Sequence, residues 1–215
     1  PYLALIADVV ESAPPMLGAQ DAHQEASGAF TGEVSLPMLE DCGVEWVLVG
    51  HSERRHVIGE SNDIVREKLH AALNAGFSVI LCTGELKEER ESGRQLEVNR
   101  AQLAHALEGL PAAALSRLVI AYEPVWAIGT GLTATPEDAQ EVHADLRAAL
   151  AEHYDQGVAD AVRIQYGGSV KPANAAELFA KPDVDGFLVG GASLKSADFL
   201  DIINAVTAAK AEGQA

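Results

Sequence analysis

Residues 117–142 read RLVIAYEPVWAIGTGLTATPEDAQEV, and this stretch decides how the rest of the sequence is interpreted. The apolar run Leu118–Tyr122 predicts a buried strand, yet the next residue is Glu123. A carboxylate at the end of an apolar strand costs free energy unless it is solvated, paired or used in chemistry. Glu123 is therefore either a solvated strand end or the base of an active site.

An alternation of strands and helices runs through all 215 residues. Short apolar segments predict six strands, at Met16–Gln20, Glu45–Gly50, Ser78–Cys82, Leu118–Tyr122, Val162–Gln165 and Gly186–Val189. Helices are expected at Tyr2–Glu11, Asp63–Asn74, Lys87–Glu108, Pro136–Tyr154, for a short run from Lys171, and at Ser196–Ala209. Repeated strand–helix units indicate a single domain with a parallel α/β fold. The pattern alone leaves a doubly wound sheet and a barrel open.

The composition is that of an acidic globular protein. Thirty-two acidic and fifteen basic residues give a formal net charge of −17, which disfavours nucleic acids and acidic membranes as partners. An anionic ligand must then be bound locally, by backbone N–H groups or a few placed charges. We expect a cytoplasmic protein without a signal peptide or membrane span.

The cysteines and most histidines carry no signal for a metal site. Cys42 and Cys82 show no metal-ligand spacing, and buried thiols in a reducing compartment are the simplest interpretation. The histidines other than His51 lie in polar or helical contexts and are expected at the surface, at positions 23, 56, 70, 105, 143 and 153.

Polar or glycine-rich turns follow five of the predicted strands. They read GHSERR, CTGE, EP, YGGS and GGAS, at residues 50–55, 82–85, 123–124, 166–169 and 190–193. Ligands bind at the carboxyl ends of the strands in parallel α/β proteins, so this arrangement indicates a binding site there. Ordinary turns are the alternative explanation for any one of them.

The two Gly-Gly turns, QYGGSV and LVGGAS, resemble each other. Consecutive glycines let the backbone approach a ligand closely and present N–H donors to an anion. Two such turns after the last two strands match the place where barrels bind phosphate. Tight turns that need positive φ angles are the structural alternative.

His51 follows a predicted strand and precedes a possible helix start. A helix N-terminus favours a neutral imidazole, which donates a hydrogen bond. A histidine with ordinary polar partners is the alternative. Combined with Glu123 as a base, a neutral imidazole can help to move a proton between adjacent carbons next to a carbonyl.

Two loops carry further signals. Residues 124–134 begin with a stiff Pro, continue with small residues and end before a helix cap, which is typical of a hinged lid. The Gly-Thr-Gly within them lacks the third glycine of a dinucleotide-binding fingerprint, so we reject a dinucleotide-binding loop here. The segment Asp21–Ser35 is long for a connection, and its apolar tip predicts either a partner surface or a loop packed on itself.

Six motifs together resemble one family, that of the triosephosphate isomerases. GAFTGEVS, VGHSERR, CTGE, AYEPVWAIGTG, QYGGSVK and LVGGASL occur in the family's order and spacing, from about Leu17 to the C-terminal helix. The resemblance implies a TIM-type (β/α) barrel and an isomerase of triose phosphates. Such an enzyme interconverts dihydroxyacetone phosphate and D-glyceraldehyde 3-phosphate through an enediolate, in glycolysis and gluconeogenesis, without cofactor or metal.

The resemblance also implies a role for each matching residue. Glu123 would be the base that shuttles the proton, and His51 the electrophile that polarises the carbonyl. The residues that bind phosphate would be Gly129, Ser169, Gly190 and Gly191. The lid and the surroundings of the catalytic groups would comprise Ser52, Glu53, Ile128, Ala134 and Tyr166. A homodimer would form through the Asp21–Ser35 loop, with Phe30, Thr31 and Gly32 at its tip.

The N-terminal part departs from the family pattern. The family fold has eight strands, whereas six are predicted here, and Tyr2–Glu11 matches the family's second helix. The first strand, first helix and second strand would then lie outside this sequence, together with a lysine that neutralises the substrate phosphate. A catalytically impaired barrel that keeps the phosphate-binding scaffold is therefore the second interpretation, and another phosphosugar enzyme of the same fold is the third.

Overall fold

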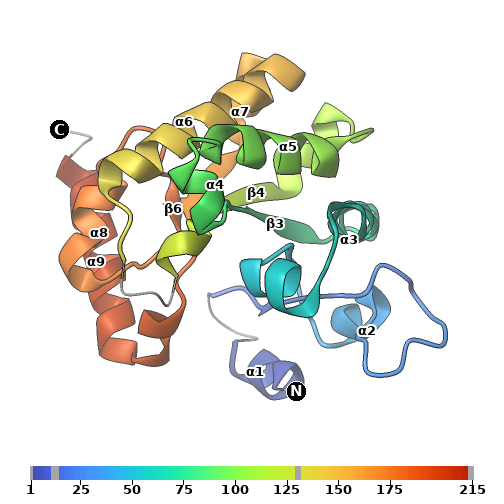
Figure 1. Cartoon of the computed structure of the whole chain (residues 1–215). Helices are drawn as coiled ribbons and strands as arrows, with labels where there is room; N and C mark the ends of the chain where they lie inside the picture. The colour runs from blue at the N-terminus through green and yellow to red at the C-terminus, as the bar shows by residue number, and fades with distance from the viewer. Residues whose placement is uncertain (1, 11–14, 129–131, 213–215) are drawn as a thin grey trace. The chain divides into compact units, whose positions relative to one another are not determined.

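The computed structural model describes residues 2–10, 15–128 and 132–212, and the chain divides into two compact units (Figure 1). The first unit comprises residues 1–82 and 104–119, and the second comprises residues 83–103 and 120–215. Two strands, β3 (Ser78–Thr83) and β4 (Leu118–Tyr122), contribute residues to both units. Each unit is described by itself below.

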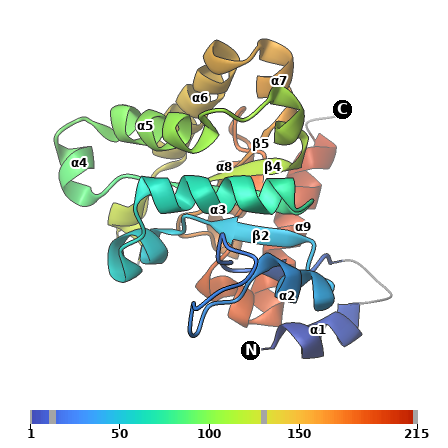
Figure 2. The same ribbon diagram turned by 90° about the vertical axis from the view of Figure 1, so that its right-hand side faces the viewer.

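The first unit is built on parallel strands. β1 (Gly18–Ala19) pairs with β2 (Trp46–Val49), and β2 pairs with β3, both in parallel. Its helical elements are α1 (Leu3–Val10), α2 (Leu36–Asp41), a π-helical turn (Arg54–Ile58), α3 (Asn62–Asn74), the last part of α5 (Gln95–Leu107) and a 3-10 turn (Ala112–Arg117). Figure 2 shows α3 lying along β2.

Helix α3 forms where the sequence predicts it. Ser61 is the N-cap, and its hydroxyl accepts a hydrogen bond from the backbone N–H of Ile64 at 3.3 Å. Val65, Leu69 and Leu73 recur at helical spacing and are all buried. The apolar face of the helix therefore supplies part of the core of this unit.

The second unit also carries parallel strands with helices between them. β5 (Arg163–Tyr166) pairs with β6 (Gly186–Phe187) in parallel. Its helical elements are α4 (Lys87–Glu91), the first part of α5 (Gln95–Leu107), a 3-10 turn (Val125–Ala127), α6 (Pro136–His153), α7 (Gln156–Ala161), α8 (Pro172–Phe179), a 3-10 turn (Gly191–Leu194) and α9 (Ser196–Glu212). Helices α8 and α9 pack side by side (Figure 1).

Strand order decides between the two sheet topologies that the sequence leaves open. The described strands follow chain order across the sheet, from β1 to β6. A doubly wound sheet reverses its strand order at a switch point, and the described strands show no such reversal. The prediction of six strands in a TIM-type α/β fold is therefore confirmed.

One helix prediction is wrong. The expected helix Lys87–Glu108 is two helices, because the chain turns at residues 92–94. The Ser92 hydroxyl donates to the backbone oxygen of Glu88 at 2.8 Å, and Gly93 adopts a φ of +72° that ends α4. The short helices α2 and α7 were not predicted, since neither has a long periodic apolar pattern.

Candidate active site

Glu123 directly follows β4 in the second unit. All five residues of β4 are buried, and Glu123 itself is only 2% exposed. Its backbone N–H donates to the carbonyl oxygen of Thr83, at the end of β3, over 2.8 Å. The acidic residue that the sequence places at a strand end is therefore inside the protein, and a fully solvated strand end is excluded.

Two glycines make room for Glu123. A Cβ atom added at Gly84 would overlap the backbone oxygen of Glu123, and one added at Gly167 would lie 3.0 Å from the Glu123 Cγ. Any larger residue would force the strand ends apart. The glycines of the CTGE and YGGS turns thus serve first to let three strand ends approach closely around this glutamate.

Glu85, the last residue of the CTGE turn, is a buried carboxylate that sequence reasoning left without a role. It is fully buried and accepts hydrogen bonds from Tyr122 Oη at 2.9 Å, Trp126 Nε1 at 2.7 Å and Asn99 Nδ2 at 3.0 Å. Burial raises the pKa of Glu85, although these donors act in the opposite direction. Its place two residues after β3 was the only sequence signal.

The predicted lid starts at the 3-10 turn Val125–Ala127 and leads to Ile128, which is 37% exposed. Gly129 lies outside the described residues. Ala134, the last residue of the predicted lid, is buried, as is Tyr166, whose hydroxyl has no hydrogen-bond partner among the described residues. A Cβ atom added at Gly168 would overlap that hydroxyl.

Packing of the described residues requires glycine in the first Gly-Gly turn but not in the second. The amide of Asn174 donates to the Ser169 backbone oxygen at 3.0 Å, which fixes the first turn. In the second turn the Ser193 hydroxyl donates to the Gly190 oxygen at 2.7 Å. A Cβ atom added at Gly190 or Gly191 would meet no heavy atom of the described chain within 4 Å. Packing of the described residues therefore does not explain these two glycines.

In the first unit, the segment after β2 is braced from within. Gly50 has a φ of +73°, and Arg55 donates through Nε to the Gly50 oxygen at 2.7 Å and through a terminal nitrogen to the Cys82 oxygen at 3.0 Å. Ser52, which begins the helical turn, is buried. Arg55 thereby joins the ends of β2 and β3.

His51 lies at the start of this helical turn and is partly exposed. The backbone N–H of Glu53 donates to His51 Nδ1 over 3.3 Å. A ring nitrogen that accepts a hydrogen bond carries no proton, so the neutral imidazole bears its proton on Nε2. The expected helix start next to His51 is confirmed, and the ring can donate from Nε2.

A buried charge cluster lies beside this segment and was not predicted. Lys68 is 4% exposed, and its ammonium donates to Asp21 at 2.8 Å and to Glu60 at 2.5 Å. Arg54 contacts the same two carboxylates at 3.0 and 2.7 Å. Burial alone would raise the pKa of Glu60, but hydrogen bonds from Lys68 and Arg54 outweigh it and lower that pKa. The cluster ties the base of the long loop to the HSERR segment.

The long Asp21–Ser35 loop packs on itself and exposes its tip. The His23 N–H donates to the Val34 oxygen at 2.8 Å, and the rings of His23 and Phe30 lie 4.1 Å apart. Phe30 is nonetheless 42% exposed, and Thr31 and Gly32 beside it are exposed as well.

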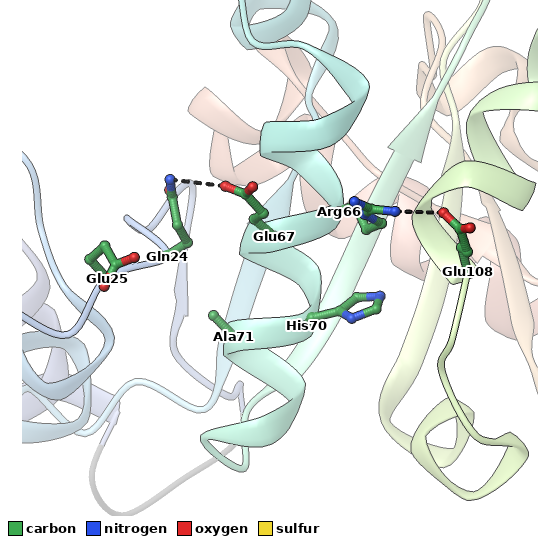
Figure 3. Close-up of a pocket in the computed structure, with 7 residues that line it drawn as sticks. All are labelled: Gln24, Glu25, Arg66, Glu67, His70, Ala71 and Glu108. Atoms are coloured by element: carbon green, nitrogen blue, oxygen red, sulfur yellow. Dashed lines mark hydrogen bonds and ion pairs between the residues drawn. The ribbon is translucent and has the colours of Figure 1, made fainter.

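Figure 3 shows a pocket in the first unit, of about 420 Å³, on the outer side of α3. It is lined by Gln24, Glu25, Arg66, Glu67, His70, Ala71 and Glu108, none of which is a predicted site residue. Arg66 pairs with Glu108 at 2.5 Å, and Gln24 donates to Glu67 at 3.4 Å. Gln24 Oε1 has no hydrogen-bond partner among the described residues, but none of the predicted site residues lines the pocket, and we assign it no ligand.

Two predictions about individual side chains are wrong. His143, expected at the surface, is fully buried because it shares the inner face of α6 with Val142 and Leu146. Cys42, expected to be buried, is partly exposed, whereas Cys82 is buried. Across the described residues no group of three or more His, Cys, Asp or Glu side chains is placed to hold a metal ion.

The fold and the site define a class of protein, the TIM-type α/β enzymes, which carry their chemistry on the turns after the strands. Residues 1–206 match the family model described as triosephosphate isomerase. Proteins called triosephosphate isomerase from Herpetosiphon aurantiacus and Chloroflexus aurantiacus are each 55% identical to this chain over 94% of its length. These matches cover 80% and 81% of the two relatives, and one from Taenia solium is 56% identical over 88% of this chain and 76% of its own. The chain belongs to the triosephosphate isomerase family.

No helix among the described residues is long and apolar enough to cross a membrane.

Proposed function

We propose that this protein interconverts dihydroxyacetone phosphate and D-glyceraldehyde 3-phosphate, a step of glycolysis and gluconeogenesis. The observation that carries the proposal is the burial of Glu123 at the end of an apolar strand, directly before a lid-like segment, in a member of the triosephosphate isomerase family. A buried carboxylate held next to bound substrate can act as a general base.

The reaction consists of proton transfers alone. The Glu123 carboxylate takes a proton from the carbon next to the substrate carbonyl, and the carbonyl becomes an enediolate. The same carboxyl group then returns the proton to the former carbonyl carbon, while the hydroxyl proton passes from one enediolate oxygen to the other, so no electrons are gained or lost overall. The base is regenerated after each turnover.

His51 stabilises the oxygen that becomes negative. The hydrogen bond from the Glu53 N–H to Nδ1 supports this role, because it leaves Nε2–H as the donor of a neutral ring. Buried Ser52 and the backbone of Glu53 hold the turn on which the imidazole sits.

Backbone N–H groups bind the substrate phosphate. Gly190 and Gly191 support this part of the proposal, since the described chain leaves open space where their side chains would be. Ser169 in the first Gly-Gly turn and Gly129 in the lid complete the set. The net charge of −17 repels an anionic ligand, so local backbone N–H groups must supply the attraction.

The lid closes over the substrate and excludes water. Exposed Ile128 at its tip supports this role, since closure would bury an apolar side chain. The buried Tyr166 hydroxyl and Ala134, at the end of the lid, hold the closed position.

The test compares Glu123→Gln with Glu177→Gln, an exposed glutamate on α8 of the same unit. Isomerisation and deuterium uptake from D₂O into the substrate carbon should both fall by at least about 100-fold in Glu123→Gln. Glu177→Gln should keep the wild-type rate. A Glu123→Gln variant that is as active as the wild type would refute the proposal.

We propose further that the protein is a cytoplasmic homodimer that associates through the Asp21–Ser35 loop. The partly exposed Phe30 at a tip whose base is held by backbone hydrogen bonds supports this, because such an apolar tip fits a partner surface. Light scattering should give twice the chain mass of 22.6 kDa, and Phe30→Asp should give the chain mass. A wild-type mass equal to that of a single chain would contradict the dimer. Fractionation of the source cells tests the location.

We also propose that the two units form one domain. Strands β3 and β4 each contribute residues to both units, which supports a single cooperative unit. The chain has two tryptophans, Trp46 in the first unit and Trp126 in the second, so variants that keep only one report on each unit separately. Within each single-tryptophan variant, the urea midpoint followed by tryptophan fluorescence should agree with the midpoint followed by far-UV circular dichroism, and two separate midpoints in one variant would contradict one domain.

A further inference from the structure

Gln102 makes a two-point contact with the backbone of Gly84. Its side-chain oxygen accepts from the Gly84 N–H at 3.0 Å, and its side-chain nitrogen donates to the Gly84 carbonyl at 3.0 Å. Gln102 lies on α5 and is half-buried, and both residues belong to the second unit. One side chain thereby satisfies both backbone polar groups of a residue that has just left strand β3.

Gly84 in turn lies against the proposed base. The place of its missing Cβ overlaps the backbone oxygen of Glu123, so the two backbones are in direct contact. The preceding residue, Thr83, accepts the Glu123 N–H at 2.8 Å. A displacement of the backbone at residues 83–84 must therefore displace the backbone of Glu123.

The neighbouring residue of the same turn is also held from α5. Asn99, three residues before Gln102, lies on the same helix face and donates to Glu85 at 3.0 Å. Glu85 is anchored from other directions too, by Tyr122 and Trp126. Gly84 has no side chain, so Gln102 is the side chain that holds it at both polar groups.

We propose that Gln102 is a positioning residue for isomerisation, which places the Glu123 carboxylate by clamping Gly84. The inference rests on the proposed role of Glu123 as the base. A reacting group displaced by about 1 Å can lose about 100-fold in rate, so even a small relaxation of the turn would lower turnover. Substrate binding through the Gly-Gly turns would be left unchanged.

The competing explanation is that Gln102 only stabilises the fold, and the chain offers a matched control. Gln140 on α6 makes a similar two-point contact, with Nε2 donating to the Asp183 carboxylate at 2.6 Å and Oε1 accepting from the Asp183 N–H at 3.1 Å. It is also half-buried and in the second unit, and no hydrogen bond described for it reaches Glu123. Loss of either clamp should therefore destabilise the fold to a similar degree.

The experiment measures kcat and KM for the wild type, Gln102→Met and Gln140→Met at a temperature at which all are folded. We expect kcat to fall about 10- to 100-fold in Gln102→Met with KM within about twofold, and both constants to stay within about twofold in Gln140→Met. Gln102→Glu keeps the acceptor for the Gly84 N–H but sets a second acceptor against the Gly84 carbonyl oxygen, and it should lower kcat as well. If Gln102→Met does not fold, Gln102→Glu decides, and a wild-type kcat in that variant overturns the proposal.

A second measurement separates positioning from stability. Glu123→Asp retracts the carboxylate by about one methylene, so the clamp can no longer place it productively, and Gln102→Met should lower kcat much less in that background than in the wild type. Fully additive effects would overturn the inference. Glu123→Gln is measured alongside to distinguish failure of the Gln102 proposal from failure of the proposed function. Only a wild-type rate in Glu123→Gln counts against the proposed function itself.

Discussion

The acid stability of this protein should depend strongly on one buried histidine, His143. The residue is fully buried, and its Nδ1 lies 3.0 Å from the Asp183 backbone oxygen. A carbonyl oxygen only accepts hydrogen bonds, so Nδ1 carries the proton. Nε2 is then an acceptor, and it has no hydrogen-bond partner among the described residues. Burial lowers the pKa of His143 from 6.5 to about 4, and the nearby Arg147 cation adds to this while Asp183 and Asp185 oppose it.

The direction of the effect follows from where the proton binds. Between pH 6.5 and about 4 the unfolded chain takes up a proton at His143 that the folded protein excludes, so the free energy of unfolding decreases as the pH falls. At about 1.4 kcal/mol for each pH unit, the interval amounts to about 3 kcal/mol. This is a large share of the roughly 5–15 kcal/mol by which domains are stable.

The assay is urea unfolding from pH 7.5 to pH 4 for the wild type, His143→Asn and His153→Asn. In His143→Asn the new side-chain amide nitrogen can replace Nδ1 as donor to Asp183 but does not titrate, and His153 is exposed in the last turn of the same helix. Over this pH range His143→Asn should lose about 3 kcal/mol less stability than the wild type, and His153→Asn should behave like the wild type. Carboxylates titrate in all three proteins, so their contribution to the pH dependence of stability cancels in the comparison. An equal loss in His143→Asn and the wild type would refute the reasoning.

Three further substitutions test other parts of the structure. Lys68→Met leaves the buried Glu60 and the half-buried Asp21 without their shared ammonium, and urea unfolding should show a loss of about 3–5 kcal/mol; a loss below about 1 kcal/mol would contradict the cluster. Gly84→Ala pushes a methyl group into the Glu123 carbonyl, so stability should fall by about 1–3 kcal/mol and kcat should fall with it; wild-type values of both would contradict this packing. Tyr166→Phe removes a buried hydroxyl without a described partner, so stability should hold or rise by about 1 kcal/mol, whereas kcat/KM should fall; unchanged kinetics would exclude a role for the hydroxyl in lid closure.

Elements with local signals were predictable from the sequence. The strand Leu118–Tyr122 has the predicted bounds, and α3 begins one residue before its predicted start, because capping and periodicity are set by neighbouring residues. The first strand was predicted at Met16–Gln20 but comprises only Gly18–Ala19, since these are the residues that find partners on β2. Strand length thus depends on pairing with a distant segment, which local patterns do not report.

The buried polar residues were not predictable, for a related reason. Lys68 and its partner Asp21 are 47 positions apart, and Glu85 and Tyr122 are 37 apart. A charged side chain can be buried only where the fold brings such partners to it. The residue type alone indicates only that burial without partners costs free energy. For His143 a signal did exist, because its helical spacing from Leu146 places it on the apolar face of α6.

At the candidate site, the residue pattern alone identifies positions but cannot rank them. Glu85 and Glu123 each follow a buried strand within two residues, and the pattern treats them alike. In the structure, three side chains from separate elements donate to the Glu85 carboxylate, so that group is an anchor of the turn. A carboxylate that takes up and returns a proton in every turnover would disrupt those three hydrogen bonds each time it was protonated. Glu85 is therefore a poor general base, which supports our proposal that the base is Glu123, directly before the lid segment.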